Sequence, residues 1–187
     1  GHVWAYEETL TEATATEGGT ASYICVNCGE HKIVATAAMG APEKGTLFYD
    51  DDLIYAVTVP GTSGGMVSVV KSTGSQTKNV VIPDAITVDG ITYKVSAISA
   101  KAFKNHKKIQ KIVIGANVTS IGKDAFNGCK KLKNITVRSS KVKSVGKNAI
   151  KNIKKNARIY CPKKKLRAYK KLFNSKSGFK KTMKITK

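Results

Sequence analysis

Hydrophobic residues recur at a nearly constant spacing between residues 95 and 165. Ile98, Ile121 and Val145 occupy equivalent positions that are 23 and then 24 residues apart. The same spacing relates three more sets of residues: Phe103, Phe126 and Ile150; Ile112, Ile135 and Ile159; and Ile114, Val137 and Cys161. A fixed period of this length predicts a solenoid, in which each repeat buries its apolar face against its neighbours.

A short strand is predicted once in each repeat. The side chains alternate with period two in residues 111–114, 134–137 and 158–161, as expected of strands with one buried face. Since equivalent residues one period apart face the same way, these segments should stack as parallel rungs of one sheet. Residues 118–122 and 142–146 predict a second line of short strands, and the segments between the two lines predict tight helical turns.

The pattern changes along the chain, which we divide into three parts. Residues 1–40 should form a small β module, because two short β-prone segments flank a Cys-x-x-Cys-Gly turn as a hairpin. Residues 41–77 alternate strand-like runs with turn residues, which predicts a β-meander. Residues 78–187 hold the solenoid and its caps. The predicted fold class is therefore mainly β.

Both ends of the solenoid should carry caps, which repeat arrays need. Asp89-Gly90 is a two-residue hairpin turn, and residues 86–93 around it predict a hairpin that caps the N-terminal end. At the other end, residues 163–173 follow Pro162 with apolar residues at helical spacing. We expect a capping helix that covers the last open rung, followed by a strand near residues 179–185.

The chain is strongly basic, but its charge is unevenly distributed. The formal net charge is +21: residues 1–93 hold 4 Lys and 11 Asp or Glu, whereas residues 94–187 hold 29 Lys or Arg and a single acid, for a formal charge of +28. Such a half attracts polyanions. Only Arg138, Arg158 and Arg167 carry the guanidinium fork that reads base edges. The charge therefore favours diffuse attraction over the readout of a nucleic-acid sequence.

No pattern in the sequence argues for catalysis or for a small-molecule substrate. The chain has no Gly-rich phosphate loop, no nucleophile with a placed base, and only three His. We therefore predict that the protein is not an enzyme. No apolar run approaches the roughly 20 residues that span a bilayer. Because Gly1-His2 opens the chain without a signal peptide, we expect a fragment or a mature segment of a larger protein.

Cys25 and Cys28 form a Cys-x-x-Cys-Gly turn that could direct two thiolates at one metal ion. A closed structural zinc site needs four ligands, and His2 and His31 are the imidazoles near this turn in the sequence. The predicted metal ligands are therefore Cys25, Cys28, His2 and His31. A local disulfide and a pair of free thiols remain alternatives, and no cofactor other than zinc is expected.

The second repeat carries a specific motif. The pattern Val-x-x-Ile-Gly-x-x-Ala-Phe-x-x-Cys-x-x-Leu-x-x-Ile-x-Val, from Val118 to Val137, resembles the BspA-type leucine-rich repeat. With its caps, the resemblance covers about residues 78–175. It implies a leucine-rich-repeat solenoid on an extracellular bacterial protein, secreted or attached to the cell surface. Such proteins are associated with adhesion to host or matrix proteins. The third repeat departs from the motif at Ile150, where Phe is expected, and looks like a terminal unit.

The N-terminal segment resembles another repeat of such surface proteins, which runs from Gly-His-x-Trp to Cys-x-x-Cys-Gly. The matching residues are Gly1, His2, Trp4, Cys25, Cys28 and Gly29. Relatives often carry a further Cys before Thr-Glu-x-Gly, where this chain has Ala15. The departure weakens the case for a metal site.

The leading functional hypothesis is a non-enzymatic binding module that adheres to an extracellular protein or to a polyanion such as a matrix or wall polymer. A structural spacer that presents other domains is the second hypothesis, and a basic nucleic-acid-binding domain is the third. Side-chain alternation places the predicted binding residues on the outer strand face, at Lys111, Val113, Lys133, Asn134, Thr136, Arg158 and Tyr160.

Overall fold

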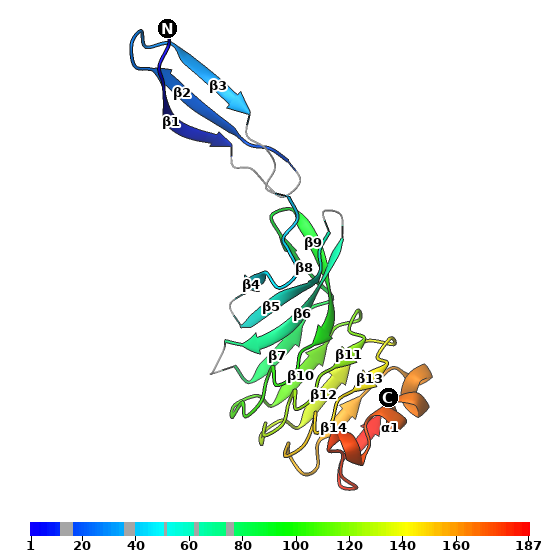
Figure 1. The fold of residues 1–187 in the computed structure, drawn as a ribbon. Coiled ribbons are helices and arrows are strands. Elements are labelled where there is room, and N and C mark those ends of the chain that lie inside the picture. The colour runs from blue at the N-terminus through cyan, green and yellow to red at the C-terminus, as the bar shows by residue number, and fades with distance from the viewer. Residues whose placement is uncertain (12–16, 36–39, 51, 62–63, 74–76) are drawn as a thin grey trace.

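The computed structural model describes residues 1–11, 17–35, 40–50, 52–61, 64–73 and 77–187. Over these residues the protein is mainly β, with one short α-helix near the C-terminus and strands grouped in three sheets (Figure 1). The mainly β prediction is confirmed.

The first sheet is three-stranded and antiparallel. It contains β1 (Trp4–Thr11), β2 (Thr20–Cys25) and β3 (His31–Ala35) in the order β1-β2-β3. The predicted hairpin is β2–β3, and β1 adds a third strand through the pairing of Trp4 with Cys25. Gly29 has a φ of 74° in the connecting turn, and its N–H donates a hydrogen bond to the Cys25 carbonyl at 2.9 Å. Glycine suits this position because it adopts a positive φ without steric cost.

The second sheet joins the predicted meander to the second line of repeat strands. Its order is β13-β11-β9-β6-β5-β4, with β8 paired to β9. These strands are β4 (Leu47–Tyr49), β5 (Leu53–Val59), β6 (Gly65–Ser72), β8 (Ala85–Val88), β9 (Ile91–Ile98), β11 (Ser120–Ile121) and β13 (Ser144–Val145).

Strand β6 pairs in parallel with β9, with Val67 opposite Val95. The predicted β8–β9 hairpin exists, but it does not close the sheet. The predicted hairpin cap is therefore wrong, because β6, β5 and β4 extend the sheet beyond β9 and satisfy its free edge. This sheet contains strands from the predicted meander, residues 41–77, and from the predicted solenoid, residues 78–187.

The third sheet is parallel and contains the main repeat strands. Its order is β15-β14-β12-β10-β7, with β7 (Asn79–Ile82), β10 (Lys111–Ile114), β12 (Asn134–Val137), β14 (Arg158–Tyr160) and β15 (Lys184–Thr186). Ile112, Ile135 and Ile159 pair in one row and are fully buried. The predicted stack of parallel rungs is thus confirmed, residue for residue.

Hydrogen-bonded turns, and not helices, connect the two parallel ladders. The N–H of Phe103 donates to the Ala125 carbonyl at 2.8 Å, and the N–H of Phe126 donates to the Ala149 carbonyl at 2.7 Å. The turns also share residues with positive φ angles. Positive φ angles recur at equivalent positions: at Lys101, Asp124 and Asn148, and again at Asn105, Gly128 and Asn152. Asp, Asn and Gly tolerate this conformation better than other residues.

One core runs through the repeats and the meander. It extends from Phe48 to Met183 without a break in packing. Phe103 and Phe126 stack in it with ring centroids 5.3 Å apart. The period of the apolar residues thus becomes a continuous column of side chains, in which each repeat covers the one before.

At the C-terminal end the expected strand is present as β15, but the helix does not have the predicted role. A 3-10 turn, η1 (Lys163–Lys165), leads into α1 (Leu166–Leu172), and a second, η2 (Ser175–Ser177), leads on toward β15. The buried Tyr169 of α1 donates its hydroxyl to the Ser139 carbonyl at 2.6 Å. The helix does not cover β14, however, because β15 pairs with that strand. A strand can satisfy the edge N–H and C=O groups of β14, and a helix cannot.

Candidate functional site

The register of the parallel sheet aligns its outward-facing residues in two rows. The first row is Asn79, Lys111, Asn134, Arg158 and Lys184, and the second is Val81, Val113, Thr136, Tyr160 and Thr186. All ten side chains are exposed or half-buried. Of the residues between them, Val80, Ile112, Ile135 and Ile159 are buried and Ile185 is half-buried. Six of the seven predicted binding residues fall in these rows, and Lys133 directly precedes β12. We call this surface the outer strand face.

Two shallow depressions connect the outer strand face to the loops that precede its strands. The first, of about 240 Å³, is lined by Lys133, Asn134, Lys154, Asn156, Arg158 and Tyr160. The second, of about 440 Å³, is lined by Gln110, Lys130, Lys131, Lys133 and Lys154. The structure therefore brings four of the predicted binding residues together with loop lysines that the sequence reasoning had not singled out.

These loop lysines form a repeating feature of their own. A Lys-Lys pair stands shortly before each of four strands of the parallel sheet, at 107–108, 130–131, 154–155 and 180–181. All but Lys108 are exposed. Because neighbouring strands lie about 4.8 Å apart, the pairs stand side by side in what we call the lysine column. The pairs follow the repeat period, so the sequence contains this signal, although net charge alone does not reveal it.

Few negative charges offset this surface. The one acid of residues 94–187 is Asp124, which is buried in a turn and accepts a hydrogen bond from the Asn127 side chain at 2.7 Å. That hydrogen bond, together with the nearby charges of Lys104, Lys123 and Lys101, lowers the pKa of the Asp124 carboxyl although burial opposes the shift. Residues 94–187 therefore add no exposed acidic side chain to the outer strand face or the lysine column.

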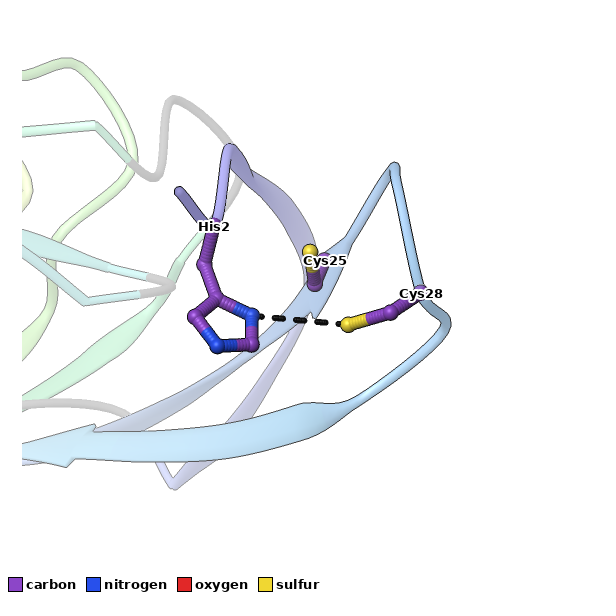
Figure 2. A group of neighbouring side chains, drawn as sticks. All are labelled: His2, Cys25 and Cys28. Carbon is purple, nitrogen blue, oxygen red and sulfur yellow. Dashed lines mark hydrogen bonds between the residues drawn. The ribbon is translucent and has the colours of Figure 1, made fainter.

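A second candidate site lies on the first sheet, where His2, Cys25 and Cys28 meet (Figure 2). One ligand atom from each residue lies within 4.8 Å of the other two. The Sγ of Cys28 is 3.4 Å from Nδ1 of His2. Cys25 is buried, whereas Cys28 and His2 are exposed. Figure 2 shows all three side chains converging at the end of the sheet where the chain begins.

The Cys25 thiol lies in a polar environment despite its low exposure. Burial raises the pKa of this thiol. Hydrogen bonds from the backbone N–H groups of Asn27 and Cys28 and from the side chains of Cys28 and His2 outweigh burial and lower the pKa to about 6. The turn thus favours the thiolate form, in which cysteine binds metal ions.

The fourth predicted ligand, His31, is not part of this group. Its Nδ1 lies 3.1 Å from Oε2 of Glu7, because β3 directs it along the face of the sheet toward β1. The structure therefore separates His31 from the three other predicted ligands. Ala15, which stands where relatives often have Cys, lies outside the described residues.

The cysteines of the repeats have a structural role. Cys129 and Cys161 are both buried, and the Cys129 thiol donates to the Phe103 carbonyl at 3.0 Å. Burial raises the pKa of Cys129 to about 11. These thiols pack as small apolar side chains and lie in repeat positions, far in sequence from the His2 group.

The comparison with protein families settles the nature of the repeats. Residues 96–186 match the family model described as the BspA type leucine rich repeat region, in six copies. Residues 96–186 are a BspA-type leucine-rich repeat region. The match extends past the predicted limit near residue 175 and includes β15. Residues 1–95, with the Gly-His-x-Trp and Cys-x-x-Cys-Gly motifs, lie outside the matched range.

Several solved structures are similar to this chain. A leucine rich cell surface protein from Faecalibacterium prausnitzii is 24% identical, with a TM-score of 0.49 over 64% of this chain and 34% of that one. A leucine-rich repeat protein from Bacteroides ovatus is 28% identical, with a TM-score of 0.45 over 60% and 31%. The pneumococcal vaccine antigen PcpA is 19% identical, with a TM-score of 0.47 over 64% and 33%.

The chain thus spans about a third of the length of these three proteins. A comparison with curated protein sequences gave no match. In the part of the chain that the structure describes, no helix is both long and apolar enough to cross a membrane.

Proposed function

We propose that this chain is a non-enzymatic binding module of an extracellular bacterial protein, which adheres to an anionic polymer of a matrix or cell wall through the outer strand face. The observation that carries the proposal is the alignment of Lys111, Arg158 and Lys184 in one row of the sheet, beside the lysine column. The BspA-type repeats supply the scaffold, since repeat proteins bind partners along extended surfaces.

The proposed architecture is a short solenoid. Its support is that β10, β12 and β14 pair in register in one ladder while β9, β11 and β13 pair in register in the other. Each turn of the chain therefore advances by one strand spacing, about 4.8 Å. A solenoid repeats its surface charges at that interval, which suits a polymer whose own charges recur along its length.

Lysine suits such a partner better than it suits a nucleic-acid sequence. Its ammonium group is a compact charge on a flexible stem and carries no fork for bidentate recognition of bases. The lysines of the column repel one another, because like charges this close raise the electrostatic energy of the free protein. A bound polyanion relieves that repulsion and releases counterions, so the affinity should fall as salt is added.

The proposal is tested by binding of the purified chain to heparin, teichoic acid, duplex DNA and extracellular-matrix proteins, at low and at physiological salt. We expect saturable binding to at least one polysaccharide or wall polymer that survives physiological salt. The triple variant K111E/K133E/R158E should weaken it by at least about ten-fold and leave the circular dichroism spectrum unchanged.

The other hypotheses correspond to defined outcomes. Preferential competition by unlabelled duplex over heparin and teichoic acid would indicate a nucleic-acid binder. Saturable binding to a matrix protein that the triple variant retains would place the adhesive surface elsewhere. Loss of every interaction at physiological salt would favour the structural spacer, with +28 as unspecific charge.

A further inference from the structure

We propose that the first sheet carries a zinc-type metal site, with His2, Cys25 and Cys28 as three of its ligands. The site is independent of the proposed polyanion surface, because all three residues lie outside the repeats. The donor set of two sulfurs and one imidazole nitrogen is typical of zinc and is poorly suited to magnesium or calcium, which prefer oxygen.

The distances allow a metal ion with small side-chain movements. Bonds of about 2.3 Å to sulfur and about 2.0 Å to nitrogen place two tetrahedral ligand atoms about 3.5 Å apart. The three ligand atoms already lie within 4.8 Å of one another, and Cys28 and His2 are 3.4 Å apart. Both of these side chains are exposed and so can rotate toward a metal ion, while the buried Cys25 provides a fixed anchor.

The backbone holds the two halves of the site together. The Val26 N–H donates to the Val3 carbonyl at 2.9 Å, and the Asn27 side chain donates to the Gly1 carbonyl at 3.2 Å. The Cys25 N–H donates to the Glu30 carbonyl at 2.7 Å and closes the turn. His2 is therefore fixed beside a turn that follows it by more than twenty residues in the sequence.

The weak core of the first sheet gives such a site a physical role. Among the described side chains of residues 1–35, the buried ones are Ala21, Ser22 and Cys25. Large apolar side chains are exposed instead: Val3, Tyr6, Leu10, Val26, Ile33 and Val34. Segments of this size rarely fold on a hydrophobic core alone and usually need a disulfide, a metal ion or a partner. A metal ion that binds only the folded sheet would stabilise it directly.

A Cys25–Cys28 disulfide is the competing explanation of the motif. It would close a loop with two intervening residues, which restricts the unfolded chain little. It would also not account for the placement of His2 next to Cys28. Both features favour the metal site.

The test is a titration of the full, reduced chain with Co²⁺, followed by competition with Zn²⁺. We expect one ion per chain, with thiolate-to-cobalt charge transfer and the d–d bands of a tetrahedral site, both of which Zn²⁺ abolishes. The variants H2A and C28S should each weaken binding by at least about ten-fold, the usual effect of losing a ligand or its support. The matched control is H31A, which removes an imidazole of the same sheet outside the group and should bind as the wild type does.

A second measurement does not depend on variants that fold. Alkylation of the wild-type chain, read by mass spectrometry, should show that Zn²⁺ protects both Cys25 and Cys28. The proposal is overturned if the reduced chain gives no thiolate-to-cobalt band, if Zn²⁺ leaves both thiols unprotected, or if H31A loses as much affinity as H2A. The variant K111E/K133E/R158E should retain the cobalt spectrum, so failure of the polyanion proposal and failure of the metal proposal are distinguishable.

Discussion

The first sheet and the repeat region bury their apolar residues to very different extents. In the repeats, Ile112, Ile135 and Phe126 are fully buried in one continuous core. In the first sheet, Ile33 is 68% exposed, and few of the described side chains are buried. Both regions are β-structure with satisfied strand pairing. Strand pairing alone therefore does not produce a core, and the packing of one repeat on the next does.

The two regions also differ in what can stabilise their folded structure. A repeated apolar pattern lets each unit of the BspA-type region cover its neighbour, so stability grows with the number of repeats. The first sheet has no such partner within its own strands. Its two thiols and the imidazole of His2 lie together at one end, where a bound ion could supply the cross-link that a core does not.

The largest loss of stability is expected from Phe126→Ala, in the core of the repeats. The ring is fully buried and stacks on Phe103, so its removal should lower the free energy of unfolding by about 3–5 kcal/mol. Chemical denaturation of the full chain measures this loss. The control Ile33→Ala, in the first sheet, should change it by less than about 0.5 kcal/mol. Similar losses in both variants would contradict the difference in packing.

A somewhat smaller effect is expected from Gly122→Ala. A Cβ at this position would lie 2.5 Å from the backbone N of Ala100, which cannot move away as a side-chain tip can. Overpacking of this kind should cost about 1–3 kcal/mol. Gly146→Ala should cost the same, because its Cβ would meet the backbone N of Lys123 at 2.5 Å one period later. Unequal losses in thermal unfolding of the two variants would show that the repeats are not equivalent.

Tyr93→Phe should increase the stability of the folded protein, in contrast to the two preceding changes. The Tyr93 hydroxyl is buried where the meander meets the repeats, and within the described residues it has no hydrogen-bond partner. Its removal relieves a desolvation cost, so we expect the variant to be more stable by about 1 kcal/mol. A lower melting temperature of Tyr93→Phe would mean that the hydroxyl has a partner in solution.

The smallest predicted effect is a pH dependence at Asp124. Its folded-state pKa is lowered from 3.8, mainly by the hydrogen bond from Asn127. A lowered pKa means that the unfolded chain binds the proton more readily, so this stabilisation is present above the ordinary carboxyl pKa and is lost as the pH falls through the folded value. Asp124→Asn should flatten the fall in stability below about pH 4. An unchanged slope in acid denaturation would contradict the shift.

The sequence alone predicted the rungs of the repeats well, because their period is regular. Ile112, Ile135 and Ile159 could be aligned by spacing and were found in one row. The strand near residues 179–185 was also predicted, but not its pairing with β14 as the next rung. Since α1 and η2 lie between β14 and β15, the step from Ile159 to Ile185 is 26 residues. A periodic argument fails where an insertion breaks the period.

Other features depend on contacts that no local pattern encodes. The parallel pairing of β6 with β9 joins segments that are not neighbours in the chain, so the meander looked like a separate unit. Likewise, the choice between His2 and His31 as a partner of the thiols follows from the pairing of Trp4 with Cys25, which the sequence does not specify. The lysine column is predictable from the spacing of its pairs, whereas net charge alone does not reveal where the lysines lie.

The most direct test of the central claim is a comparison of two charge-reversal variants in heparin and teichoic-acid binding at physiological salt. K111E/K133E/R158E alters two residues of the outer strand face and the adjacent Lys133. K123E/K143E/K147E changes as many exposed lysines beside β11 and β13 instead, so net charge falls equally in both. The account predicts at least a ten-fold loss of affinity for the first variant and near wild-type binding for the second. Equal losses in the two would show that binding follows net charge and not this face.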